Sequence, residues 1–174
     1  MRFAWGKAAL VAAMLTLAAC DRGHDAASLA ALAQEAAAFM KTNAAAEGVT
    51  TLPSGLQYKV VRAAPAGGES PDRNDLVSVN YEGALTDGTV FDSSYERGAP
   101  YVTTPEQVVP GWTEALQRMK VGDEWLLYVP PELGYGEQGG PPTIPPNAVL
   151  VFRIELLDVA PAPGGGSGVG MATG

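Results

Sequence analysis

The sequence has one cysteine, Cys20, and one histidine, His24, and both lie near its start. A metal site built from thiolates and imidazoles is therefore not expected, and Ser/His and Cys/His nucleophilic mechanisms have no histidine base in the rest of the chain. Basic residues are also few: 11 Lys and Arg stand against 19 Asp and Glu, which gives a formal net charge of −8. The Lys and Arg residues form no cluster in the sequence. Binding to phosphate backbones depends on such clusters, so nucleic acid is not an expected partner.

Residues 1–19 predict a signal peptide. Arg2 and Lys7 form a positive flank, and the apolar run Ala8–Leu17 that follows is short. A helix needs about 20 apolar residues to cross a bilayer, so this run is not expected to span one. The segment predicts export from the cytoplasm, and the fold is expected to begin after it.

The signal segment ends in LAAC at residues 17–20, which resembles the lipobox of bacterial lipoproteins. In that family the cysteine becomes the lipidated first residue, so Cys20 is the predicted lipidation site and acyl chains would anchor the protein to a membrane. Ordinary secretion after a small-residue cleavage site is the alternative. Aspartate in the second mature position, here Asp21, often signals retention at the inner membrane in such lipoproteins. The predicted location is the bacterial cell envelope, facing the periplasm, with the inner membrane favoured.

Residues 20–51 predict a helical leader and linker. The segment from Asp25 to Ala46 is rich in alanine with apolar residues at helical spacing, Asp25 is its expected N-cap, and Gly48 is its expected stop. The apolar stripe could pack on the domain, pair with a second copy or act as a spacer. At the other end, residues 161–174 lack apolar periodicity and predict a flexible Gly-rich tail.

Residues 52–160 predict one α+β domain with about five antiparallel strands and one short helix. Its central feature is a hairpin in which Val77, Val79 and Tyr81 alternate with polar residues. The expected turn holds Asp87-Gly88, with positive φ at both positions, and the return strand ends in Phe91-Asp92. Further strands are predicted at residues 56–62, 124–129 and 148–159, and the helix begins at Pro110 with its apolar stripe on Trp112, Ala115, Leu116 and Met119.

Four segments in order, VNYEGALTDGTVFDSS, VVPGWTEALQRMKVGD, PPELGYG and IPPNAVLVFRIELLDV, resemble the FKBP-type peptidyl-prolyl cis–trans isomerases. The helical leader followed by LPSGLQY resembles their bacterial Mip-like branch. The resemblance implies a twisted antiparallel sheet wrapped around one short helix, with a hydrophobic proline pocket between them. It implies no cofactor and no metal, because rotation about a peptide bond needs neither.

The resemblance also assigns roles to residues. Trp112 would form the pocket floor, the Tyr135 hydroxyl would point at a substrate carbonyl, the Val109 backbone N–H would bond a neighbouring carbonyl, and Asp92 would lie at the rim beside Tyr81. The expected catalytic set is Tyr81, Phe91, Asp92, Trp112, Tyr135 and Phe152, and the expected substrate contacts are Tyr101, Val108, Val109 and Ile144.

Two positions depart from the family pattern. Thr103 stands where many members have Phe, and Tyr101 could supply part of the missing aromatic surface. Gly140-Pro141-Pro142 fills a loop that varies in the family. Both departures affect the expected substrate preference and inhibitor affinity more than the expected activity.

The function implied is isomerisation of X–Pro bonds during the folding of exported proteins. The expected partners are unfolded or partly folded polypeptides that contain proline, and macrolide inhibitors of the tacrolimus or rapamycin type. The alternative is a chaperone or docking module that uses the same fold to hold proline segments with little turnover. Each pocket residue taken singly could also be an ordinary core or half-buried side chain, and only the ordered set of motifs favours the pocket.

Overall fold

One twisted antiparallel sheet forms the centre of the computed structural model, which describes residues 25–162. The strand order is β1-β2-β6-β7-β3-β4, and β5 pairs with β3 outside this path. The strands are β1 (Val49–Thr51), β2 (Gln57–Arg62), β3 (Leu76–Leu85), β4 (Val90–Ser93), β5 (Tyr101–Thr103), β6 (Glu124–Val129) and β7 (Leu150–Ala160). The helices are α1 (Ala26–Asn43), α2 (Ser94–Arg97) and α3 (Pro110–Leu116), with 3-10 turns η1 (Pro105–Gln107), η2 (Pro131–Leu133) and η3 (Gly136–Gln138).

The predicted α+β class is confirmed, but the predicted count of about five strands is too low, since the sheet has seven. The two strands that the prediction omits are β1 and β5, each three residues long. Three residues are too few to show a period-two pattern, which is why neither strand is evident from the sequence.

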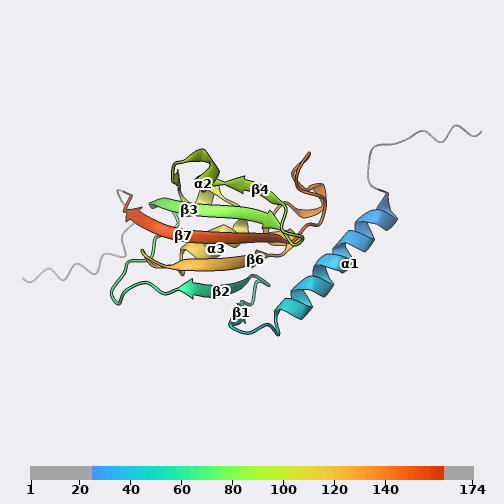
Figure 1. Ribbon diagram of the computed structural model, residues 1–174, viewed down its shortest axis with the longest axis horizontal. Helices are drawn as coiled ribbons and strands as arrows, with labels where there is room; N and C mark the ends of the chain where they lie inside the picture. Colours follow the sequence, from blue (N-terminus) through green and yellow to red (C-terminus); the bar gives the residue numbers. More distant parts are fainter. Residues whose placement is uncertain (1–24, 163–174) are drawn as a thin grey trace, which may run out of the picture.

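The core lies between one face of the sheet and α3 (Figure 1). β3 and β7 are the longest strands and pair along their whole length, with Tyr81 opposite Ile154 and Gly83 opposite Phe152. Val77 and Val79 are fully buried, as the alternation predicts. The face that carries them is therefore the one that α3 covers.

The short helix α3 packs tightly on β6 because Gly111 has no side chain. A Cβ atom at Gly111 would lie 2.7 Å from Cγ1 of Val129, closer than real Cβ contacts come. The stripe of Trp112, Ala115 and Leu116 is buried as predicted, and Met119, just past the helix end, is buried with it. This close approach sets the position of Trp112 relative to the sheet.

The turn between β3 and β4 differs from the expected one. Gly88 has a φ of 88°, but Asp87 does not have positive φ, since Asn147 is the one non-glycine residue with positive φ between residues 25 and 162. The Gly88 N–H donates to the Leu85 carbonyl (3.0 Å), and the Asp87 carboxylate accepts the Thr89 N–H (2.8 Å). The loop is thus a turn without positive φ at Thr86 or Asp87, followed by Gly88 in the left-handed conformation. A register shift after Gly83 accommodates the extra residue.

The helix α1 begins as predicted, because the Asp25 carboxylate accepts the Ser28 N–H at 2.7 Å. It ends at Asn43, several residues before the expected stop at Gly48, which instead turns the chain into β1 with a φ of 77°. α1 lies beside one end of the sheet (Figure 1). It is held there by hydrogen bonds from Asn147 to the Leu29 carbonyl (3.0 Å) and from Gln57 to the Met40 carbonyl (2.8 Å).

Within residues 25–162, no helix is both long enough and apolar enough to cross a membrane. The predicted signal segment, Cys20, Asp21 and most of the predicted tail lie outside the described residues.

Candidate active site

A cavity of about 440 Å³ opens between α3, the β3–β4 hairpin and the loop after β6. Every residue predicted for the proline pocket lines it except Ile144, and two unpredicted residues, Arg97 and Gln107, join them. The full lining is Tyr81, Phe91, Asp92, Arg97, Tyr101, Gln107, Val108, Val109, Trp112, Tyr135 and Phe152. Segments far apart in the sequence therefore meet at one place.

Trp112 forms the centre of an aromatic cluster in the cavity. Its ring meets the ring of Tyr81 edge to face, with centroids 5.0 Å apart, and the ring of Phe152 in the same way at 5.2 Å. Phe91 meets Phe152 edge to face at 5.6 Å. Each such pair contributes about 0.5–1.5 kcal/mol beyond its buried area, so the walls hold one another in place.

Gly83 makes room for two of these rings. A Cβ atom at Gly83 would lie 2.7 Å from Cε1 of Phe152 and 2.8 Å from Cε2 of Phe91. Both distances are shorter than any side chain tolerates, so the aromatic wall depends on glycine at this position of β3.

A polar cluster borders the aromatic one at the rim. The Tyr81 hydroxyl donates to the Asp92 carboxylate, and the Arg97 guanidinium donates to the other oxygen of Asp92 and, at 2.9 Å, to the Tyr81 hydroxyl oxygen. Burial, followed by the hydrogen bond to Asp92, raises the pKa of Tyr81 to about 12. The phenol is therefore neutral at physiological pH, and both Asp92 oxygens are engaged.

Arg97 was not predicted, although the sequence contains a signal for it. Ser93 and Glu96 have the spacing of a helix N-terminal capping box, and Gly98 stands where a short helix would stop. In the structure the Ser93 hydroxyl accepts the Glu96 N–H at 3.4 Å, and Gly98 has a φ of 68°. This single helical turn, α2, carries Arg97 back to Asp92. Gln107, the other unpredicted residue, has no comparable signal.

Tyr101 lines the cavity beside Tyr81. Its ring lies edge-on to Tyr81, with centroids 5.9 Å apart. Thr103, on the same strand, pairs with Val77 in the register, is buried and does not line the cavity. The arrangement is consistent with Tyr101 providing aromatic surface that Thr103 does not.

The cavity also contains polar groups without protein partners. Within residues 25–162, neither the Val109 N–H nor the Tyr135 hydroxyl has a hydrogen-bond partner in the protein, and the buried indole N–H of Trp112 has none either. The Val109 carbonyl is engaged, since it accepts the Trp112 N–H at 2.9 Å. Free donors beside an apolar cavity suit a ligand that brings carbonyl oxygens.

Ile144 lies outside this cavity. It exchanges two backbone hydrogen bonds with Gly140, at 2.9 and 2.8 Å, and its side chain is buried in the hydrophobic core. The contact of Ile144 with substrate stays a prediction. No cluster of three or more His, Cys, Asp or Glu residues suited to a metal occurs in the described part of the chain.

The profile of the family described as FKBP-type peptidyl-prolyl cis-trans isomerase matches residues 67–157. The profile described as the domain amino terminal to FKBP-type peptidyl-prolyl isomerase matches residues 7–60. A crystal structure of a peptidyl-prolyl cis-trans isomerase from Pseudomonas syringae pv. tomato DC3000 is 36% identical, with a TM-score of 0.73 over 80% of this chain and 100% of that one. The chain belongs to the FKBP-type peptidyl-prolyl cis–trans isomerase family.

Relatives of this FKBP-type chain include the protein named peptidyl-prolyl cis-trans isomerase Mip of Coxiella burnetii. The two are 53% identical over 127 residues, which are 73% of this chain and 54% of the relative. The outer membrane protein MIP of Legionella longbeachae is 47% identical over 127 residues, 72% of this chain and 53% of the relative. The chain thus spans about half the length of these relatives.

Proposed function

We propose that this FKBP-type chain is a peptidyl-prolyl cis–trans isomerase that accelerates rotation about X–Pro bonds in unfolded or partly folded polypeptides. The observation that supports this most directly is the cavity floored by Trp112 and walled by Tyr81, Phe91 and Phe152. Its volume of about 440 Å³ lies within the range of sites that enclose small ligands. A pyrrolidine ring fits such a slot and would be shielded from water on several sides.

The chemistry follows from removing water around the amide. Double-bond character in the C–N bond sets a barrier of about 18–20 kcal/mol, and water stabilises the planar, polar amide. In an apolar cavity the twisted amide, with less charge separation, becomes relatively more favourable. Uncatalysed exchange takes tens to hundreds of seconds. Millisecond turnover therefore needs roughly 6–7 kcal/mol of differential stabilisation.

The polar groups are assigned to orientation. The Val109 N–H and the Tyr135 hydroxyl would hold carbonyls that flank the proline, so that the chain turns on one side of the bond only. Asp92 is engaged by Tyr81 and Arg97, and its proposed role is to hold the tyrosine wall and shape the field at the rim. No proton has to move in this reaction, so none of these residues acts as a general acid or base.

The same cavity supports a second proposal, that macrolides of the tacrolimus or rapamycin type inhibit the protein. Apolar walls around the unpartnered Val109 N–H and Tyr135 hydroxyl would accept a ring that imitates a prolyl peptide and brings its own carbonyl oxygens. The exposed Tyr101 at the rim would contact the outer part of such a ligand.

For its location we propose lipidation at Cys20 and residence in the cell envelope, facing the periplasm. The support is the LAAC sequence at residues 17–20, Asp21 after it, and the relative from L. longbeachae that is named an outer membrane protein. Asp21 favours the inner membrane and the relative's name favours the outer one. Mass spectrometry of the mature N-terminus, with membrane fractionation, would test both points.

The activity is tested by refolding a protein whose slow phase is limited by an X–Pro bond. The intact chain is expected to accelerate this phase, and Trp112→Ala to lose most of the acceleration. Trp125→Ala is the matched control: Trp125 is a buried tryptophan whose indole N–H also lacks a partner within residues 25–162, but it does not line the cavity. Rates are compared per folded molecule. Binding of the unfolded chain without acceleration would show a holding module instead of an enzyme.

A further inference from the structure

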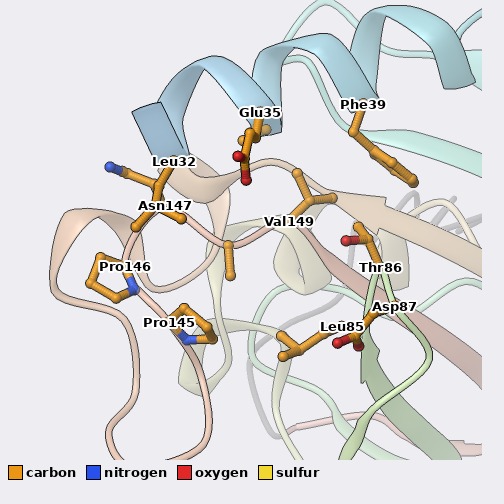
Figure 2. Close-up of a pocket in the computed structure, with 12 residues that line it drawn as sticks. Leu32, Glu35, Phe39, Leu85, Thr86, Asp87, Pro145, Pro146, Asn147 and Val149 are labelled. Carbon is orange, nitrogen blue, oxygen red and sulfur yellow. The ribbon is translucent and has the colours of Figure 1, made fainter. Parts of the chain in front are cut away.

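A second, smaller groove lies between α1 and the body of the domain (Figure 2). Its volume is about 210 Å³, and it is bounded by α1, the turn after β3 and the loop before β7. Most of its lining is apolar: Leu32 and Phe39 from α1, Leu85 from β3, and Pro145, Pro146, Ala148 and Val149 from the loop. The groove is separate from the predicted proline site, because the two cavities share no lining residue.

Two carboxylates border this apolar surface. Glu35 points from α1 toward the loop, and Asp87 lies across the groove on the β3–β4 turn (Figure 2). A hydrogen bond from the Thr89 N–H lowers the pKa of Asp87, so it stays ionised. No Lys or Arg lines the groove, and neither carboxylate takes part in an ion pair within residues 25–162. The groove therefore combines apolar walls with uncompensated negative charge.

The groove lies close to the proline site along the chain. The β3–β4 hairpin supplies Phe91 and Asp92 to the larger cavity and Asp87 to the groove. The four steps from Phe91 to Asp87 run from β4 into the turn, so they span at most about 13 Å, the length of the same number of residues in an extended strand. An extended peptide covers that distance in roughly four to six residues, so one polypeptide could reach both sites at once.

We propose that the groove holds an apolar segment carrying Lys or Arg, from the same polypeptide whose proline enters the Trp112 cavity; this rests on the proposed function. A volume of about 210 Å³ is below that of most small-molecule sites, which begin at about 300 Å³, and suits one or two side chains. Charge complementarity selects a basic partner. Binding at the groove raises the local concentration of nearby prolines at the catalytic cavity.

The test uses a short synthetic peptide and a long one in two versions. The short one has four residues and one X–Pro bond. The long one adds a spacer of four Gly and Ser residues and a Leu-Arg-Leu-Lys segment, placed before the proline in one version and after it in another. The intact chain is compared with the double variant Glu35→Lys, Asp87→Lys and with Glu47→Lys. Glu47 is exposed and lies outside both cavities, and its change to Lys shifts the net charge in the same direction, by half as much as the double variant does.

With the intact chain, kcat/KM is expected to be about three- to tenfold higher for one version of the long peptide than for the short one, the size expected of two exposed ion pairs. The double variant should lose this advantage and leave the short peptide unchanged, whereas Glu47→Lys should keep it. Equal rates for long and short peptides, or an equal loss in Glu47→Lys, would overturn the proposal.

Two further readouts distinguish peptide binding in the groove from self-association and from a failure of the proposed function. If the double variant changes the molecular mass in sedimentation, the groove is an interface between copies of this chain and the proposal is wrong. If the intact chain fails to isomerise the short peptide, the proposed function is contradicted, while the groove remains testable. Fluorescence anisotropy of a labelled Leu-Arg-Leu-Lys peptide should still show binding that the double variant loses.

Discussion

Tyr81 and Trp112 meet edge to face, with ring centroids 5.0 Å apart and ring planes at 86°. The ring of Tyr81 thus supports the floor of the cavity, while its hydroxyl is held by Asp92 and Arg97 at the rim. One side chain of β3 connects the apolar and polar halves of the site. A change to either half is therefore expected to affect the other.

Gly83→Ala tests whether the aromatic walls need the space beneath them. The new Cβ would collide with Phe152 and Phe91, and overpacking of this kind typically costs about 1–3 kcal/mol. Displaced walls should also lower kcat/KM, by roughly ten- to a hundredfold. Urea unfolding and peptide isomerisation measure the two effects. Gly140→Ala is the control, since its Cβ would meet only ordinary contacts with Ile144, and unchanged behaviour of both variants would contradict the packing argument.

The pKa of Tyr81 predicts a loss of stability at high pH. Tyrosine in an unfolded chain ionises at about pH 10. Burial and Asp92 raise the pKa of Tyr81 to about 12, so the folded state keeps the proton longer than the unfolded state. The stabilisation is complete below pH 10 and is lost as the pH rises through 12.

The measurement is the free energy of unfolding between pH 8 and 12. The intact chain should lose stability relative to Tyr81→Phe over the upper part of this range, because the variant has no phenol to ionise. Tyr101→Phe serves as the control, since no residue from 25 to 162 forms a hydrogen bond with the Tyr101 hydroxyl. Parallel curves for the intact chain and Tyr81→Phe would show that this phenol does not carry the effect.

Arg97→Lys should loosen the rim without emptying the floor. The planar guanidinium reaches both Asp92 and Tyr81, and a lysine ammonium cannot reproduce this two-pronged contact. Because the side chain is half exposed, the expected loss of kcat/KM is modest, about two- to fivefold. Arg118→Lys, at a similarly exposed arginine that pairs with Glu114, should leave kcat/KM unchanged. A similar loss in both variants would indicate a general effect of the substitution.

The sequence predicted which residues line the cavity better than it predicted the connections around it. Alternation identified the inward faces of the long strands, as Val77 and Val79 show, and the resemblance brought the aromatic set together. The role of Arg97 depends on a single helical turn whose short-range capping signals are easy to overlook. Ile144 was placed by analogy, yet its bridge to Gly140 depends on loop geometry that periodicity does not describe. The prediction of positive φ at Asp87 was wrong because an Asp-Gly pair occurs both in two-residue hairpin loops, which need it, and in three-residue loops, which do not.

For the leader, too, the sequence predicted the helix but not its place in the fold. Its helical periodicity and the Asp25 cap were readable, but three positions for the helix were open: packed on the domain, paired with a second copy or extended as a spacer. The structure places it against the domain through polar side chains, among them Gln57 and Asn147, that lie far away in the sequence. A helix with one modest apolar stripe cannot encode such partners by its own pattern.

Gln57→Ala tests this docking of α1. The Gln57 amide donates to the Met40 carbonyl and accepts from Asn43, both at 2.8 Å, and so joins the last turn of α1 to β2. Removing two partly buried hydrogen bonds should let α1 detach more often and raise the hydrogen-exchange rates of its amides by about tenfold. Gln117→Ala removes an exposed bond to the Thr113 carbonyl of its own helix and should leave α1 protected. The core strands β3 and β7 should keep their protection in both variants, since they do not contact this amide. Unchanged exchange in α1, or faster exchange throughout the sheet, would mean that the hydrogen bonds of Gln57 do not hold the helix locally against the domain.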